Sequence, residues 1–343
     1  MIACFALTFA LTASCQDEVG PESFMQEYSD LKNQAIAMAF ENVNSIGPTK
    51  TKIKNLLESP FLKQNPGHFS KQFLTALNSD LSVLENIGEA KFKHFREAFF
   101  NFGNKVFYEM VENRFKEDQK DLNKLQIEVA KNFKPFSTVH LRTEYVKIGA
   151  LIEHNKKKDF SGIISKSQNA FEGSGWGQNP ELHFFLDLQA MNYWGQADFK
   201  KQKEAALKEI EILEANFGKE EGRLLNPQSL ALLANVELGD INQAKAIFSS
   251  IRPEYLKLET WASAKVLARI HKAAVVLFLK EKDYEKAKSS QKAVLNNLKL
   301  YMDDNDARLL REAVRFRDLL IKLEDTKELE LLEKEYQFYP LIK

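Results

Sequence analysis

The chain has 343 residues, of which 44% are hydrophobic and 28% are charged, so it carries enough apolar surface to fold as a globular protein. Its 48 lysine and arginine residues balance 48 aspartate and glutamate residues, which argues against a protein dedicated to binding nucleic acid. Only 14 glycines and 9 prolines interrupt the chain, too few for the turns of an all-β protein of this length. The composition therefore predicts long helices in about two domains.

The first fifteen residues form an uncharged apolar run that ends at Gln16-Asp17-Glu18. The run is shorter than the roughly 20 residues of a membrane-spanning helix, but it has the length of the apolar region of a secretory signal peptide. Thr12-Ala13-Ser14-Cys15 resembles the lipobox of bacterial lipoproteins, in which the cysteine is acylated and becomes the new N-terminus. The resemblance implies a signal peptide over residues 1–15, a lipid on Cys15 and a short tether over residues 16–21.

This leader also indicates where the protein resides. A lipid on Cys15 implies anchoring in the cell envelope, and we expect the outer membrane of a Gram-negative bacterium. Two alternatives remain open, namely an ordinary signal peptide cleaved near Ser14 and a cytosolic protein.

The N-terminal third of the chain has apolar residues three and four positions apart, the period of an amphipathic helix. One stripe runs from Phe24 to Met38 and is expected to stop at Gly47-Pro48, and a second runs from Phe69 to Leu84. Dense apolar residues between Phe92 and Met110 predict a buried helix. We expect residues 22–136 to form a helical bundle.

A second organisation begins near residue 140, where an aspartate followed by an apolar residue recurs between helical segments. The four occurrences, spaced 39, 42 and 43 residues apart, are Asp159-Phe160, Asp198-Phe199, Asp240-Ile241 and Asp283-Tyr284. The clearest copy, from Ala231 to Phe248, resembles a tetratricopeptide repeat, in which small residues let two antiparallel helices approach closely and an aromatic residue fills the next hairpin. The residues that carry the resemblance across the copies are Phe160, Phe199, Gly239, Ala244, Phe248, Tyr284 and Ala287.

The resemblance implies an all-α protein in which the N-terminal bundle is followed by a tetratricopeptide-like α-solenoid of helical hairpins over residues 137–343. Residues 306–323 and 327–338 are expected to be capping helices. In this family the first helices of the hairpins line a groove that binds a protein partner. The register places the following residues on that face: Tyr145, Phe184, Asp187, Met191, Trp194, Arg269 and Lys272.

Aromatic and charged residues on such a face suit a peptide groove, because aromatic side chains anchor a partner and charges orient it. The alternative is that Tyr145, Phe184 and Met191 pack against the N-terminal bundle instead.

A glycine-rich loop, Gly173 to Gly177, carries Trp176. Its glycine spacing matches neither a dinucleotide-binding fingerprint nor the nucleophile turn of serine hydrolases. Trp176 is therefore expected either to contact a ligand such as a sugar or to pack as a structural residue.

No catalytic or metal-binding pattern is evident in the sequence, because the six histidines lack the spacing of metal ligands. We expect no metal and no cofactor. A hydrolase on the N-terminal bundle, with Glu97, Glu109 and Glu112 as acid or base groups, is an alternative for which nothing positions a nucleophile.

These features together predict a non-enzymatic, lipid-anchored envelope protein that acts as a scaffold for another envelope protein or a peptide. The alternative function is a solute- or glycan-binding lipoprotein of a nutrient uptake system, with the loop around Trp176 as its site.

Overall fold

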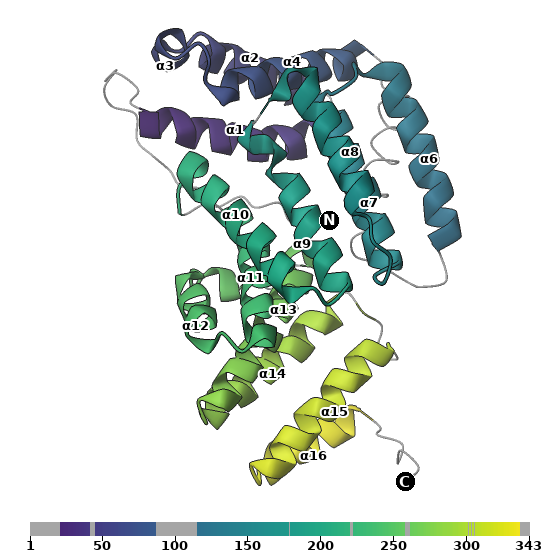
Figure 1. Cartoon of the computed structure of the whole chain (residues 1–343), viewed down its shortest axis with the longest axis vertical. Helices are drawn as coiled ribbons and strands as arrows, with labels where there is room; N and C mark the ends of the chain where they lie inside the picture. The colour runs from purple at the N-terminus through teal and green to yellow at the C-terminus, as the bar shows by residue number, and fades with distance from the viewer. Residues whose placement is uncertain are drawn as a thin grey trace. The chain divides into compact units, whose positions relative to one another are not determined.

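The computed structural model describes residues 21–41, 45–86, 115–177, 179–219, 222–257, 261–300, 302, 304 and 306–336. Every regular element in these ranges is a helix, which confirms the expected all-α class for the described part of the chain (Figure 1). The α-helices are α1 (Pro21–Glu41), α2 (Ile46–Leu57), α3 (Pro60–Gln64), α4 (Phe69–Asn86), α6 (Phe115–Asn132), α7 (Thr138–His154), α8 (Ser161–Phe171), α9 (Phe184–Gly195), α10 (Phe199–Phe217), α11 (Leu225–Leu238), α12 (Ile241–Ser250), α13 (Trp261–Lys280), α14 (Tyr284–Lys299), α15 (Ala307–Lys322) and α16 (Thr326–Glu335).

The chain divides into two compact units. The first unit comprises residues 1–188 and 212–220, and the second unit comprises residues 189–211 and 221–343. α9 and α10 therefore contribute residues to both units. The structure groups α7 and α8 with the N-terminal helices, whereas the expected boundary at residue 136 placed them with the repeats. The extent of the repeat array remains a prediction.

Aromatic side chains form the centre of the first unit. Phe24 and Tyr28 on α1 are fully buried. The ring of Phe24 stacks on Phe61, with 4.4 Å between centroids, and the ring of Tyr28 meets Phe73 edge-on at 5.9 Å. These contacts explain the apolar stripe that begins at Phe24.

The expectation that Gly47-Pro48 stops the first helix is wrong in its detail. α1 already ends at Glu41, and Gly47-Pro48 lies in the first turn of α2. Proline is tolerated there because the first backbone nitrogens of a helix have no acceptor within the helix. The expected helix between Phe92 and Met110 lies outside the described residues.

A buried carboxylate joins α4 to the start of α7. Oδ2 of Asp80, a residue only 2% exposed, accepts hydrogen bonds from the backbone N–H and the hydroxyl of Thr138, at 2.9 and 2.6 Å. The free N–H groups of a helix start are thus partly satisfied by a side chain from another helix. Burial raises the pKa of Asp80 to about 6, against the opposing effect of these hydrogen bonds.

Four connections between helices share one backbone geometry. The residue before each aspartate has a positive φ, which is 57° at Ala197, 78° at Gly239, 61° at Lys282 and 56° at Glu324. The backbone N–H of the next residue donates to the carbonyl five residues earlier, at 2.9 Å for Asp198, 2.8 Å for Asp240, 2.9 Å for Asp283 and 3.0 Å for Asp325. This is the Schellman arrangement that ends many helices.

Three of these aspartates then begin the next helix. The side chains of Asp198, Asp283 and Asp325 each accept the backbone N–H three residues later, all at 3.2 Å. Aspartate is favoured at this position because its carboxylate satisfies a free amide of the first turn. At these three positions the recurring aspartate is therefore a helix cap. Asp240 makes no side-chain cap bond, and Asp159 does not share the turn geometry, because the N-cap of α8 is Phe160 and no positive φ precedes Asp159.

The turn at Asp325 continues the spacing found in the sequence, 42 residues after Asp283. The sequence pattern missed it because Thr326, which is not apolar, follows the aspartate. α15 and α16, which were expected to be capping helices, are thus joined by the same kind of turn as α13 and α14.

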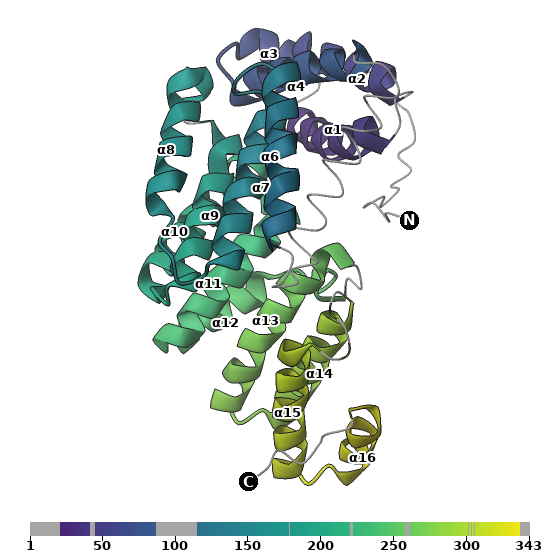
Figure 2. The same cartoon turned by 90° about the vertical axis from the view of Figure 1, so that its right-hand side faces the viewer.

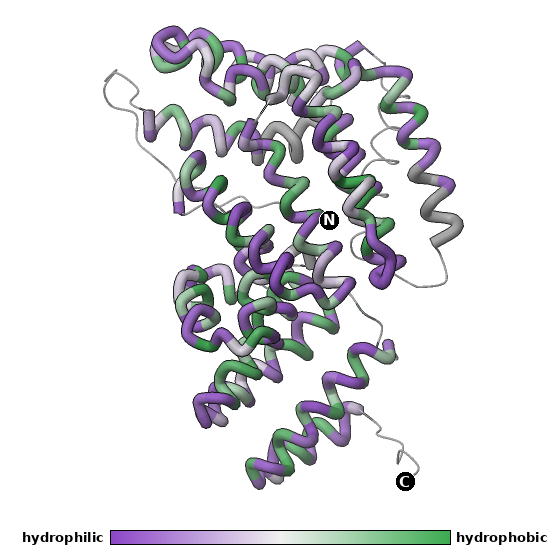
Figure 3. The backbone as a smooth tube through the Cα atoms, viewed as in Figure 1, coloured by the Kyte–Doolittle hydropathy of each residue, from purple (hydrophilic) through white to green (hydrophobic). Residues whose placement is uncertain are grey.

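The second unit has a hydrophobic core along α14, α15 and α16. α13 packs against α11 and α14, and α15 packs against α14 and α16. Hydrophilic and hydrophobic residues alternate along these helices, and α15 and α16 lie close to each other at the C-terminal end (Figures 2 and 3). The cluster consists of Ala268, Val294, Leu295, Leu298, Leu309, Ala313, Phe316, Leu320, Leu332 and Tyr336.

Several residues that carry the repeat resemblance lie at helix contacts. Phe160, Ala244 and Ala287 are buried, and the ring of Phe248 on α12 meets Phe278 on α13 edge-on at 5.6 Å. Phe199 and Tyr284 are half-buried. Within the described ranges, none of the helices combines the length and apolarity required to cross a membrane.

Candidate functional site

Three of the residues expected on the partner-binding face meet in the first unit. The hydroxyl of Tyr145 on α7 donates a hydrogen bond of 2.5 Å to Asp187 on α9, and its ring lies 5.1 Å from that of Phe184. Asp187 is only 2% exposed, whereas Tyr145 and Phe184 are half-buried. The carboxylate of Asp187 is therefore engaged within the fold.

A second buried charge in the first unit was not predicted. Glu181 is fully buried, accepts a hydrogen bond of 2.8 Å from the hydroxyl of Tyr28 and forms an ion pair with Lys32. The ammonium of Lys32 lies 5.2 Å from the ring centroid of Phe73, a cation–π contact. Because 149 positions separate Lys32 from Glu181, no local pattern indicates the pair.

Arg269 on α13 is the most constrained of the expected residues in the second unit. Its guanidinium lies 4.9 Å from the ring centroid of Trp194 and donates to Asn226 at 3.1 Å and to Ser229 at 2.9 Å. Arg269 is 7% exposed, whereas Trp194 is half-buried. The arginine therefore links α13 to α9 and α11, and the tryptophan keeps part of its surface accessible.

Lys272, one turn further along α13, pairs with a carboxylate that sequence reasoning missed. Glu312 on α15 is 4% exposed and accepts from Lys272 and Arg315, both at 2.8 Å, and from Gln291 at 3.2 Å. Burial, the largest single effect, raises the pKa of Glu312, but Lys272, Gln291 and Arg315 together outweigh it and hold that pKa below its usual range. Glu312 is consequently ionised near neutral pH.

The seven expected residues thus fall into two groups. Tyr145, Phe184 and Asp187 belong to the first unit, and Met191, Trp194, Arg269 and Lys272 belong to the second. Met191, like Asp187 and Arg269, is buried. The more accessible members are Tyr145, Phe184, Trp194 and Lys272, and their contact with a partner remains a prediction.

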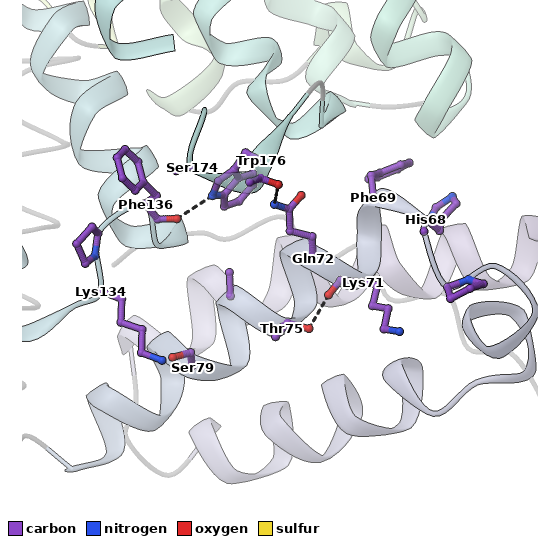
Figure 4. A pocket seen from close by; sticks show the side chains of 15 residues that line it. His68, Phe69, Lys71, Gln72, Thr75, Ser79, Lys134, Phe136, Ser174 and Trp176 are labelled. Carbon is purple, nitrogen blue, oxygen red and sulfur yellow. Dashed lines mark hydrogen bonds between the residues drawn. The ribbon is translucent and has the colours of Figure 1, made fainter. Parts of the chain in front are cut away.

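Trp176 lines an open groove of about 650 Å³ in the first unit (Figure 4). The tryptophan is 5% exposed, and its indole N–H donates to the carbonyl of Phe136 at 2.8 Å. Gln72 holds the same loop by donating to the carbonyl of Gly175 at 2.5 Å. This is the packed arrangement that was the alternative to ligand contact for Trp176, although part of the side chain still faces the groove.

The charged residues that line this groove are Lys71 and Lys134, and no carboxylate of the described residues does so. Figure 4 shows Lys134 extending towards Ser79. Amide and hydroxyl groups from Gln72, Thr75 and Ser79 complete a polar wall. The groove is thus suited to a polar or anionic molecule.

Cys15, the expected lipidation site, lies outside the described residues, as do Glu97, Glu109 and Glu112. In the part of the chain that the structure describes, no three histidine, cysteine, aspartate or glutamate side chains come close enough to hold a metal ion. No protein-family model, curated protein or solved structure matches the chain.

Proposed function

We propose that this chain is a lipid-anchored scaffold of the bacterial cell envelope that binds a protein partner along the first helices of tetratricopeptide-like hairpins. The observation that carries the proposal is the repetition of one turn geometry at Ala197, Gly239, Lys282 and Glu324. Turns of one kind at spacings of 42 and 43 residues support an array of similar hairpins. Such an array presents a preformed surface, so little ordering entropy opposes binding.

The buried charges are used within the fold. Glu181, Arg269 and Glu312 are each engaged by partners that stabilise helix packing. An anchor on Cys15 would raise the effective concentration of the scaffold at the membrane, which strengthens binding to a partner in the same membrane. We place the protein in the outer membrane of a Gram-negative cell.

The anchor is tested by metabolic labelling with an alkynyl fatty acid, followed by membrane fractionation. We expect label in the membrane fraction for the wild type and none for Cys15→Ala. A soluble, unlabelled wild-type protein would refute the anchor.

The scaffold is tested by photocrosslinking in the cell envelope. A photoreactive amino acid replaces Val276 on α13, which is 39% exposed, and the matched control replaces Leu331 on α16, which is 59% exposed. We expect one protein to be crosslinked from Val276 and not from Leu331. Equal crosslinking from both positions, or none from Val276, would argue against partner binding by the first helices.

The second candidate function, a solute- or glycan-binding lipoprotein, is favoured by the groove beside Trp176. Titration with soluble oligosaccharides would then change tryptophan fluorescence in a saturable way. Lys71→Ala should weaken this response, whereas Lys63→Ala, at an exposed position on α3, should leave it unchanged. A response that does not saturate would remove this candidate.

A further inference from the structure

Two helices of the second unit, α13 and α15, carry an excess of positive charge in a chain that is neutral overall. α13 contains three lysines and one arginine and no acidic residue. α15 contains four arginines and one lysine, against Glu312 and Asp318. The chain as a whole has equal numbers of acidic and basic residues. α2 and α14 also carry an excess of lysines, but every lysine of α14 pairs with a carboxylate.

The cations of α13 lie along one face. Lys265, Arg269, Lys272 and Val276 are separated by four, three and four positions, which places them on one side of the helix. The ion pair of Lys272 with Glu312 joins this face to α15. Val276 is exposed and adds an apolar position to the face.

The cations of α15 continue this surface. Arg308, Arg311, Arg315 and Lys322 fall on the same side of α15 as Glu312, within about one quarter-turn of it at 100° per residue. We call the surface formed by these residues together with Lys265, Lys272 and Val276 of α13 the α13–α15 face; Arg269 lies on the same side of α13 but is buried. Besides Glu312, two carboxylates lie at this face: Asp306 pairs with Arg308 at 2.7 Å, and Asp318 is on the same side of α15 as Arg311 and Lys322.

The charges of the α13–α15 face do not balance. Glu312 is one carboxylate shared by two cations, Lys272 and Arg315. Arg311 is exposed and donates only to the carbonyl of Ala307, at 3.3 Å, and Lys322 is exposed and lies over the ring of Tyr284 at 5.7 Å. Neither of these two pairs with a carboxylate among the described residues, so the face can accept further negative charge.

We propose that the α13–α15 face binds an acidic segment of the partner protein. The inference rests on the proposed scaffold function and specifies the chemistry of its partner. The contacts of Glu312 show that cations of this face can hold a carboxylate, because Lys272 and Arg315 both bind that of Glu312 at 2.8 Å. The exposed Val276 favours a peptide over a nucleic acid, because a peptide supplies apolar side chains, and one exposed valine is far less than the broad apolar face by which a helix binds a lipid surface.

The test measures fluorescence anisotropy of a labelled twelve-residue peptide of alternating glutamate and leucine, titrated with the purified protein. A peptide with glutamine in place of glutamate is the neutral control. The α15 variant is Arg311→Glu with Lys322→Glu, and the matched variant is Lys327→Glu with Lys334→Glu, which makes the same charge change at exposed positions of α16. Thermal unfolding followed by circular dichroism checks that each variant is folded.

We expect the wild type to bind the acidic peptide and the α15 variant to bind it about tenfold more weakly, because each exposed charge pair contributes modestly and two are reversed. The α16 variant should stay within about twofold of the wild type, and affinity should fall as salt concentration rises. Equal weakening in both variants, or equal binding of the glutamine peptide, would overturn the inference.

Vesicles containing phosphatidylglycerol test the lipid alternative. Vesicle binding that requires Arg311 and Lys322, without binding of the acidic peptide, would overturn the inference in favour of a membrane surface. If a partner is crosslinked from Val276 but the acidic peptide does not bind, the inference that the partner segment is acidic is refuted, and the proposed scaffold function still stands. Peptide binding that requires Arg311 and Lys322 supports the inference, and failure to crosslink a partner would then count against the scaffold alone.

Discussion

The turn at Gly239 provides the sharpest test of how the hairpins are built. Gly239 has φ of 78° and ψ of 9°, the left-handed conformation, at the end of α11. Its backbone N–H donates to Val236 at 3.1 Å, and the next N–H, that of Asp240, donates to Asn235 at 2.8 Å. A Cβ added at Gly239 would meet no atom within 4 Å. Any cost of Gly239→Ala therefore arises from backbone conformation alone.

Two opposing effects determine how much Gly239→Ala lowers the free energy of unfolding. Alanine in the left-handed conformation costs about 1–2 kcal/mol. The unfolded chain loses flexibility when alanine replaces glycine, which returns about 0.4–1 kcal/mol. We expect Gly239→Ala to lower the free energy of unfolding by about 1 kcal/mol, which corresponds to a fall in Tm of about 2–4 °C for a unit of this size. Urea and thermal unfolding followed by circular dichroism measure both quantities.

Gly162 supplies the matched control. It lies in the first turn of α8, shows no positive φ and also has open space around an added Cβ. Gly162→Ala should therefore leave stability unchanged or raise it by up to about 1 kcal/mol. If Gly239→Ala proved as stable as the wild type, or if both substitutions destabilised equally, the argument from backbone conformation would be refuted.

Three other substitutions test the remaining structural claims. Lys282→Gly should raise the free energy of unfolding by roughly 0.5 kcal/mol, because glycine relieves the positive φ of 61° at that turn, and thermal unfolding would show a lower Tm if this is wrong. Burial raises the pKa of Asp80 to about 6, so the folded state binds the proton of this carboxyl more tightly than the unfolded state does. Protonated Asp80 therefore contributes stability in full below about pH 4. This contribution, up to about 3 kcal/mol, is lost as the pH rises through 6. Urea unfolding across pH 4–7 should show this decline in the wild type and not in Asp80→Asn. Glu181→Gln should cost about 3–5 kcal/mol because it leaves the charge of Lys32 buried without its carboxylate, and an added Lys32→Met should recover part of that loss in a double-mutant cycle.

Much of the helical architecture follows from local sequence patterns. The apolar stripe from Phe69 to Leu84 corresponds to α4, and the Asp198, Asp240 and Asp283 positions each lie between two helices. Periodicity predicts a helix because residues three and four apart share a face, and aspartate marks a helix start because its carboxylate binds free amides. Both effects act over a few residues, so a single sequence reveals them.

The failures have equally specific causes. The turn at Asp325 escaped the pattern because Thr326 replaces an apolar residue, although Glu324 adopts the same positive φ as Gly239. A search for aspartate alone at spacings near 42 would have found it. Gly47-Pro48 does not locate a helix end by itself, because the pair can either follow a helix or occupy the first turn of the next one, as it does in α2.

The sequence by itself determined the helical class, the turns at Asp198, Asp240 and Asp283 and the excess of basic residues on α13 and α15, because each depends on neighbours within one or two helical turns. Only the tertiary structure decided which charges meet. Lys32 reaches Glu181 and Lys272 reaches Glu312 through packing between segments that are distant in sequence, whereas Arg315 reaches Glu312 within one turn of α15. Burial of a charge depends on all the helices around it, and for that reason the packed chain alone reveals which cations are satisfied and which remain available to a partner.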